Sequence, residues 1–140
     1  MRTMVVDSGI LLALLDPNDA QHHAATAALE RHMADGLRLT VPVTALSQVL
    51  VGAYRATPYA VRTVERFVDD LIGDVHAADR TVGRAAARLL ADHPTLLLAD
   101  ALLIATGEVL GAQGVLTTNQ QLEQVNHRIR VLTGEPGSAG

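Results

Sequence analysis

Short apolar runs rich in β-branched residues alternate with longer stretches of helical periodicity along almost the whole chain. Runs of this kind fit buried strands, whereas the longer stretches repeat their apolar residues with the period of a helix. Strands that are separated by helices pair in parallel through right-handed crossovers, and the helices then cover both faces of the sheet. The pattern therefore predicts an α/β fold with a five-stranded, mostly parallel sheet and helices on both faces.

The expected elements follow from this alternation. Strands are expected over residues 3–6, 39–41, 74–76, 115–117 and 129–132. Helices are expected over residues 8–15, 20–34, 44–56, 59–72, 79–92, 99–110 and 120–125. Asp19 is the expected N-cap of the second helix, because its carboxylate can accept a backbone hydrogen bond there. Pro58 separates two helices, since proline lacks the N–H donor that a continuous helix needs.

The chain shows no internal repeat and no break in composition before its last residues. Residues 134–140 read GEPGSAG, which has the Gly/Pro/Ser character of a frayed terminus. One domain over residues 1–133 and a flexible C-terminal tail over 134–140 are therefore expected.

Composition limits the kind of protein this is. The 140 residues include no cysteine, which excludes disulfides and thiolate metal sites and suits a reducing cytoplasm. Asp7 interrupts the apolar N-terminal run, which we interpret as a strand and helix rather than a signal peptide, and no apolar stretch is long enough to span a bilayer. The net charge of −4 argues against a protein that coats nucleic acid non-specifically, although a locally basic groove stays open.

Two acidic residues are candidate functional residues, for different reasons. Asp7 directly follows the first expected strand, at the sheet edge where such folds bind ligands; its alternative role is a helix N-cap. Asp100 lies near the start of a helix in the apolar segment LLLADALLIATG, where a carboxylate is costly unless it is paired or bound to metal. Its alternative role is to cap that helix or to complement its positive end.

Four segments in order carry a family resemblance: VVDSGILLALLD, SQVLVGAYR, LLLADALLIATG and GVLTTNQQL. Over residues 3–132 they resemble the PIN-domain family, and their spacing is similar to that of VapC-type toxin ribonucleases of toxin–antitoxin systems. The resemblance implies four acidic residues that hold Mg²⁺ or Mn²⁺ at the carboxyl end of the sheet. Asp7 matches the first of them and Asp100 the third, so both are expected to be metal ligands.

The other two acidic positions depart from the family pattern. Gln48 stands where the family usually has Glu, and Asn119 stands where the fourth acid usually follows a Thr. As alternatives, Gln48 shares a possible solvated helix face with Thr44, Gly52 and Arg55, and Asn119 suits the N-cap of the helix that follows. An amide oxygen can ligate a cation but carries no charge, which predicts one weakly held ion rather than a pair.

The resemblance implies a function in the same terms. The chain is expected to be a Mg²⁺-dependent endoribonuclease toxin of reduced activity that leaves a 5′-phosphate and a 3′-hydroxyl, with Asp7, Asp100, Gln48 and Asn119 at the catalytic site. RNA, a cognate antitoxin and a second copy of the chain are the expected partners. One alternative is a catalytically impaired PIN module that binds antitoxin or RNA, and a weaker one is a small-molecule phosphohydrolase.

Other residues have a functional and an ordinary interpretation side by side. Thr117 and Thr118 could bind a phosphate or a metal-bound water, and strand propensity explains them equally well. The three aromatic residues suit either a partner surface or the core: Tyr54, Tyr59 and Phe67. Four arginines suit either RNA backbone or solvated helix faces: Arg62, Arg66, Arg84 and Arg88. Two groups are interpreted as surface residues: the histidines His22 and His23, and the acidic run Asp69, Asp70 and Asp74.

Overall fold

Five parallel strands form one sheet in the computed structural model, which describes residues 2–132. The strands are β1 (Thr3–Val6), β2 (Arg38–Pro42), β3 (Val75–His76), β4 (Gly114–Thr117) and β5 (Ile129–Val131). The helices are α1 (Ser8–Leu15), α2 (His22–Ala34), α3 (Val43–Ala56), α4 (Pro58–Leu71), α5 (Arg80–Asp92), α6 (Leu98–Leu110) and the short 3₁₀ helix η1 (Gln120–Gln124). The α/β fold with a five-stranded sheet is thus confirmed, and every pairing between the described strands is parallel.

The strand order reverses at the centre of the sheet. The order is β3-β2-β1-β4-β5, so β2 and β3 are added on one side of β1 and β4 and β5 on the other. Val5 in β1 therefore pairs with Thr40 in β2 and with Val115 in β4. The crevice at the carboxyl ends of β1 and β4 is the place where folds of this kind bind ligands.

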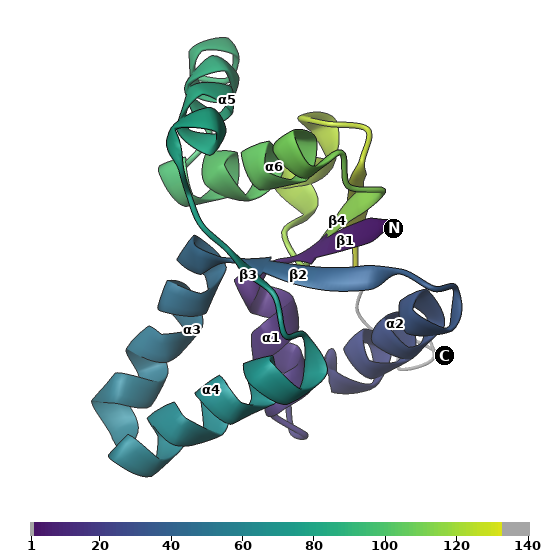
Figure 1. Ribbon diagram of the computed structural model, residues 1–140, viewed down its shortest axis with the longest axis vertical. Helices are drawn as coiled ribbons and strands as arrows, with labels where there is room; N and C mark the ends of the chain where they lie inside the picture. The colour runs from purple at the N-terminus through teal and green to yellow at the C-terminus, as the bar shows by residue number, and fades with distance from the viewer. Residues whose placement is uncertain (1, 133–140) are drawn as a thin grey trace.

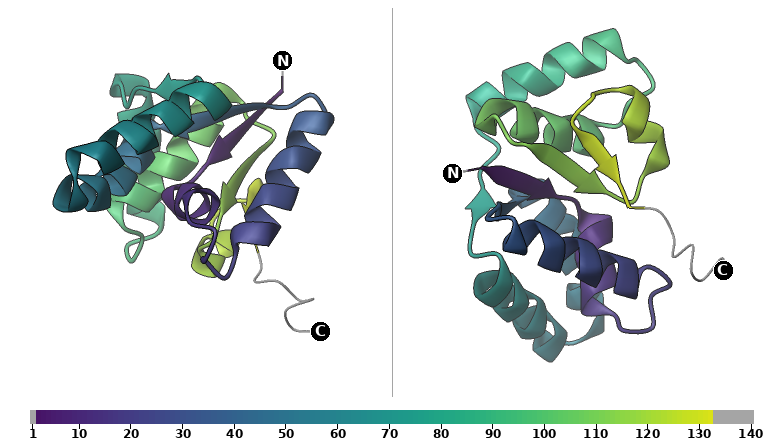
Figure 2. Two further views of the ribbon diagram at one scale, coloured as in Figure 1. Left: turned by 90° about the horizontal axis from the view of Figure 1, so that it is seen from below. Right: turned by 90° about the vertical axis from the view of Figure 1, so that its right-hand side faces the viewer.

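Helices cover both faces of the sheet, as predicted. Successive side chains of β1 point to opposite faces: Met4 and Val6 pack in the core with α1 to α4, and Val5 packs in the core with α5 and α6. Figure 1 shows these two groups of helices on either side of the sheet, and Figure 2 shows the same division from two other directions.

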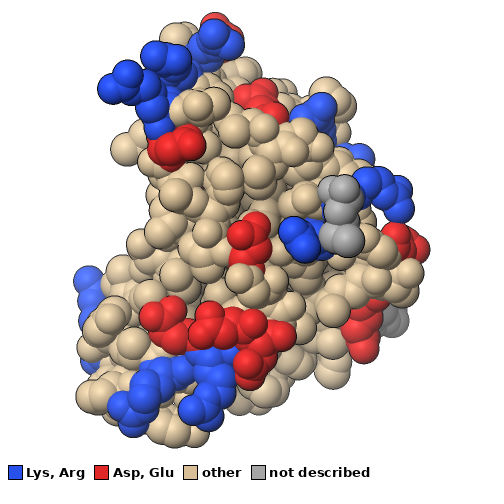
Figure 3. Space-filling model, in the orientation of Figure 1, with Lys and Arg blue, Asp and Glu red and all other residues tan. Residues whose placement is uncertain are grey.

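Two arms flank the carboxyl edge of the sheet. One is formed by α3 and α4 and the other by α5 and α6, and the space-filling view shows a hollow between them (Figure 3). α3 follows β2 directly, and α6 begins at the same edge, so both helices lead away from the reversal point. Within residues 2–132, no helix is long and apolar enough to cross a membrane.

The predicted start of α2 was wrong. The helix begins at His22 rather than at residue 20, and Asp19 is not its N-cap. The Asp19 carboxylate instead accepts a hydrogen bond from the Gln21 backbone N–H at 2.8 Å, which closes a local turn. Aspartate stabilises both turns and helix caps, and here the turn forms. The other boundaries agree to within one residue, and the expected tail over 134–140 lies outside the described residues.

Candidate active site

Asp7 lies at the carboxyl end of β1 and is fixed by bonds on both carboxylate oxygens. Oδ1 accepts a hydrogen bond from the Ser8 backbone N–H at 2.6 Å, so Asp7 is the N-cap of α1. Oδ2 accepts a hydrogen bond from the Thr117 hydroxyl at 2.6 Å. The expected cap is therefore present, and the same carboxylate is also tied across the sheet to β4.

Thr117 links the ends of β1 and β4. Its side chain is fully buried, and its hydroxyl donates to Asp7 and accepts from the Asn119 backbone N–H at 3.0 Å. A buried hydroxyl that both donates and accepts has a fixed direction. Thr117 therefore positions Asp7 and the turn behind β4, and this contact, rather than strand propensity alone, explains a threonine there.

Asp100 lies in the first turn of α6, half-buried and close to Asp7. Burial raises the pKa of the Asp100 carboxyl, and the negative charge of Asp7 raises it further. Of its two alternative roles, capping is wrong, because no side chain caps α6 and Leu97 is its N-cap residue, whereas its place in the first turn agrees with complementing the positive end of the helix. Neither cause of the shift is a cation, so the structure brings two carboxylates together at the sheet edge, and no positive charge from residues 2–132 offsets that of Asp100.

Asn119 lies in the turn between β4 and η1. Its carboxamide oxygen accepts a hydrogen bond from the Gln121 backbone N–H at 3.0 Å, so the expected N-cap is present. Asn119 and Asp100 also line one cavity of about 410 Å³. The structure therefore brings Asn119 to the same site as the two acids.

Gln48 is the candidate that the structure does not tie to the others. Its side chain is exposed on α3, on one face with exposed Gly52 and Arg55, which agrees with a solvated face. Within residues 2–132, the hydrogen bonds and the cavity that involve Asp7, Asp100 or Asn119 do not include it. No group of three or more His, Cys, Asp or Glu suited to a metal lies among those residues.

Gly9 contributes to the site in a way that was not predicted. It is the second residue of α1, and a Cβ at this position would collide with the Thr118 hydroxyl. Only glycine allows the start of α1 to approach the turn behind β4 so closely. A glycine in the first turn of a helix, directly after Asp7-Ser8, was the available signal.

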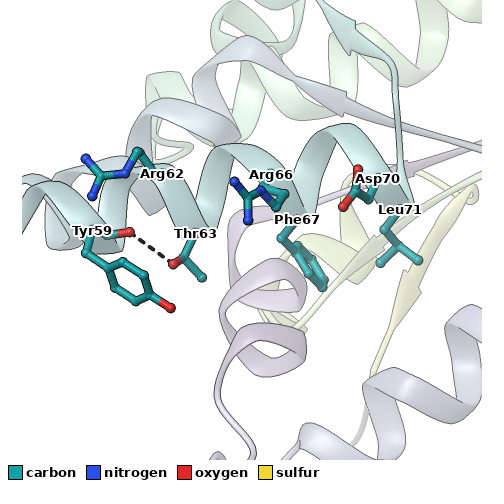
Figure 4. Close-up of a pocket in the computed structure, with 7 residues that line it drawn as sticks. All are labelled: Tyr59, Arg62, Thr63, Arg66, Phe67, Asp70 and Leu71. Carbon is teal, nitrogen blue, oxygen red and sulfur yellow. Dashed lines mark hydrogen bonds between the residues drawn. The ribbon is translucent and has the colours of Figure 1, made fainter.

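The proposed partner residues lie away from this site. Tyr54 and Tyr59 are 70% and 71% exposed, so the core interpretation is wrong for both, whereas Phe67 is half-buried and packs against the core. Residues of α4 line a separate hollow of about 470 Å³ (Figure 4). Its lining includes Tyr59, Phe67 and the two arginines of α4 but none of the four site candidates.

Two of the residues expected on the surface make specific contacts, although Asp74 is exposed as expected. His22 is half-buried, and its Nδ1 lies 2.7 Å from the Ala13 carbonyl oxygen, which ties the start of α2 to α1. The Asp74 carboxylate accepts a hydrogen bond from the buried hydroxyl of Thr40. His23, Asp69 and Asp70 are exposed, as expected.

Comparisons with known proteins agree with this architecture. Residues 4–128 match the family model of the PIN domain. No curated protein is significantly similar to the chain in sequence.

Several solved structures share the fold. A toxin–antitoxin complex from Klebsiella pneumoniae has a TM-score of 0.74 at 18% identity, over 94% of this chain and 99% of that one. VapBC2 from Rickettsia felis, bound to a promoter DNA fragment, has a TM-score of 0.76 at 9% identity, over 94% of this chain and 99% of that one. VapC20 from Mycobacterium tuberculosis, described as a toxin that cleaves the sarcin–ricin loop, has a TM-score of 0.63 at 18% identity. The match covers 80% of this chain and 86% of that one.

Proposed function

The chain belongs to the PIN domain family, and on this premise we propose that it is a VapC-type toxin: a metal-dependent endoribonuclease of reduced activity. One observation supports this proposal above the others. Asp7 and Asp100 come from distant parts of the chain and meet at the carboxyl edge of the sheet, close enough for one charge to raise the pKa of the other carboxyl. Evolution keeps such unfavourable pairs mainly at functional sites.

The residues present fit one hard divalent cation. Mg²⁺ and Mn²⁺ prefer oxygen ligands, and Asp7 and Asp100 would hold the ion. Such an ion, when bound, lowers the pKa of a water molecule and stabilises charge on the leaving oxygen. Ser8 and Thr117 hold the Asp7 carboxylate in one orientation, so that it need not be ordered when the ligand arrives. Half-burial of Asp100 keeps its charge poorly solvated and therefore available to a cation.

The proposed reduction in activity rests on the two amides. At an effective dielectric constant of about 20, each unit of negative charge near a divalent ion contributes an attraction of several kcal/mol before desolvation is counted. Replacement of two carboxylates by Gln48 and Asn119 therefore weakens ion binding without closing the site.

The decisive experiment restores the acids. In Gln48→Glu/Asn119→Asp, the substitutions are nearly isosteric, and we expect Mn²⁺ affinity, measured by calorimetry, and Mg²⁺-dependent cleavage of a structured RNA to rise together. One regained charge near a divalent ion should raise affinity by about tenfold or more. Adding Asp7→Asn should abolish the gain, because the cluster loses its strand-end member.

Gln113→Glu is the matched control. It adds the same charge at an exposed glutamine beside the amino end of β4, at the opposite edge of the sheet. If the control raises cleavage as much as Gln48→Glu does, the effect is one of net charge. If the folded double variant binds Mn²⁺ and cleaves RNA as the wild type does, Gln48 and Asn119 do not stand at acid positions.

The proposal includes partners and a compartment. Structures similar in fold are complexes of toxin with antitoxin, two of them with DNA. We propose that this chain likewise binds a cognate antitoxin, forms a homodimer and acts on RNA in the cytoplasm. The exposed tyrosines of α3 and α4 are the proposed antitoxin surface.

The alternative is a catalytically impaired PIN module that acts by binding antitoxin or RNA. The observation that favours it is the lack, within residues 2–132, of any cluster of three potential metal-binding acids or histidines. Wild-type protein that binds antitoxin or RNA, yet cleaves no RNA at saturating Mn²⁺, would establish this alternative over the nuclease.

A further inference from the structure

We infer that the cavity beside Asp100 is a nucleobase pocket, which selects the nucleotide adjacent to the scissile phosphate. The inference rests on the proposed function, because it assigns sequence selection to the same RNA site. The cavity measures about 410 Å³ and lies between the α5–α6 connection, the first turn of α6 and η1. Cavities that bind small molecules begin at about 300 Å³, so a base with its ribose fits.

The lining combines amides with apolar side chains. Carboxamide groups come from Asn119, Gln121 and Gln124, and apolar groups come from Leu96, Leu122 and Val125. Carboxamides donate and accept at once, which suits the edge of an unstacked base, while apolar walls suit its faces. His93, also in the lining, adds a ring on which a base can stack.

The charge of the lining argues for a base rather than a phosphate. Among residues 2–132, Asp100 is the one acidic side chain that lines the cavity, and no arginine of that range lines it. Cationic side chains supply most of the attraction for a phosphate, and a carboxylate without a bound cation repels an anion. A neutral ring with hydrogen-bonding edges is the part of a nucleotide that this lining accepts.

Asn119 connects the cavity to the acidic pair. Its carboxamide oxygen is occupied by the Gln121 N–H, and its backbone N–H bonds to Thr117, which holds Asp7. The amide nitrogen is thus the atom of Asn119 that is left to donate to a base. A nucleotide whose base enters the cavity therefore has its phosphate next to Asp7 and Asp100, where the proposed divalent cation would offset the charge of both carboxylates. An amide at position 119 then serves recognition as well.

The test measures binding without catalysis. Fluorescently labelled single-base RNAs (oligo-A, oligo-C, oligo-G and oligo-U) are titrated in EDTA against the full chain. We expect the wild type to prefer one base by about tenfold, the discrimination that one amide–base pair supplies. Gln121→Ala/Gln124→Ala should remove most of this preference. Gln120→Ala, an exposed glutamine of the same helix that does not line the cavity, should keep it.

A second measurement uses free nucleosides, which carry no phosphate. Titration of the preferred nucleoside should shift the side-chain amide NMR signals of Asn119, Gln121 and Gln124, but not that of Gln120. Equal binding of all four RNAs by the wild type, or a preference that survives in the folded double variant, would overturn the inference.

The outcomes separate this inference from the proposed function. Base-selective binding by a protein that cleaves no RNA would keep the pocket and reject the nuclease. A protein that cleaves RNA with Mg²⁺ but binds all four RNAs equally in EDTA would support the proposed nuclease and reject the base pocket.

Discussion

The two acidic residues of the site differ in how the fold holds them. Asp7 accepts hydrogen bonds on both carboxylate oxygens and caps α1, so its charge supports the fold. Asp100 is half-buried and has its pKa raised by burial and by Asp7, so its charge opposes the fold. A carboxylate kept at a cost to stability points to function, whereas one that stabilises a cap does not.

This difference predicts opposite effects on stability. A raised carboxyl pKa means that the folded state binds its proton more tightly than the unfolded state, so stability is lost as pH rises through that pKa. At pH 7 in EDTA, Asp100→Asn should therefore have a higher Tm than the wild type, with the difference shrinking as pH falls towards 3.8, the ordinary value. Asp7→Asn should instead lower the free energy of unfolding by about 1 kcal/mol, because it weakens the hydrogen bonds from Ser8 and Thr117.

Thermal unfolding followed by circular dichroism checks this, with and without Mn²⁺. The ion should raise the Tm of the wild type and leave both variants nearly unchanged, because each has lost a ligand. If the wild type has a higher Tm than Asp100→Asn in EDTA at pH 7, the charge of Asp100 does not destabilise the fold.

Thr117 is predicted to matter for metal binding through its hydrogen bond to Asp7. Thr117→Val leaves the Asn119 N–H without its partner and frees Asp7, so we expect a loss of about 1–3 kcal/mol in stability and weaker Mn²⁺ binding. Thr40→Val is the matched control, since Thr40 is equally buried and also donates to an aspartate, Asp74. Urea unfolding should show similar losses for both variants, and calorimetry should show reduced Mn²⁺ affinity only for Thr117→Val.

At the scale of elements, α3 and α4 form an arm with an exposed aromatic surface. Tyr54 lies in the last turn of α3 and Tyr59 in the first turn of α4, on either side of Thr57-Pro58. Thr57 caps α4 with a hydrogen bond from the Ala60 N–H at 3.0 Å, which fixes the break between the two helices. Figure 1 shows the break between α3 and α4 at the end of this arm, away from the sheet, and both tyrosines flank that break.

This separation predicts that antitoxin binding and the metal site respond to different substitutions. Tyr54→Ala/Tyr59→Ala should strongly reduce co-purification with the protein encoded by a short upstream reading frame, because exposed aromatic side chains often dominate interface energy. Asp7→Asn/Asp100→Asn should bind that protein as the wild type does. Loss of binding in the folded acid variant, but not in the tyrosine variant, would move the antitoxin surface to the site.

At the scale of the whole molecule, charge is distributed unevenly although the net charge is −4. Three exposed arginines follow one side of α5, at positions 80, 84 and 88, and Figure 3 shows basic side chains gathered on that arm. On the α4 arm, arginines lie beside acidic side chains that offset them (Figure 3). The α5 arm therefore offers phosphate groups the less compensated positive surface next to the hollow.

Element types and their approximate bounds could be predicted because they depend on local patterns. The period of the apolar residues predicted the strands and helices. The Thr57-Pro58 pair predicted the break between α3 and α4. The start of α2 could not be predicted, because Asp19 suits a turn and a cap equally well and only the surrounding chain selects one. The exposure of Tyr54 and Tyr59 also depends on which face of each helix meets the core.

The sequence by itself determined that this chain builds a parallel sheet and that Asp7 and the Thr117–Asn119 segment end two of its strands. Those facts follow from local periodicity and from short-range geometry. Only the tertiary structure decided that Thr117 bonds to Asp7, that Asp100 meets Asp7, and that Gln48 stays exposed while Asn119 faces a cavity. These outcomes depend on strand order and on helix rotation about its axis, which arise from the packing of residues far apart in the chain.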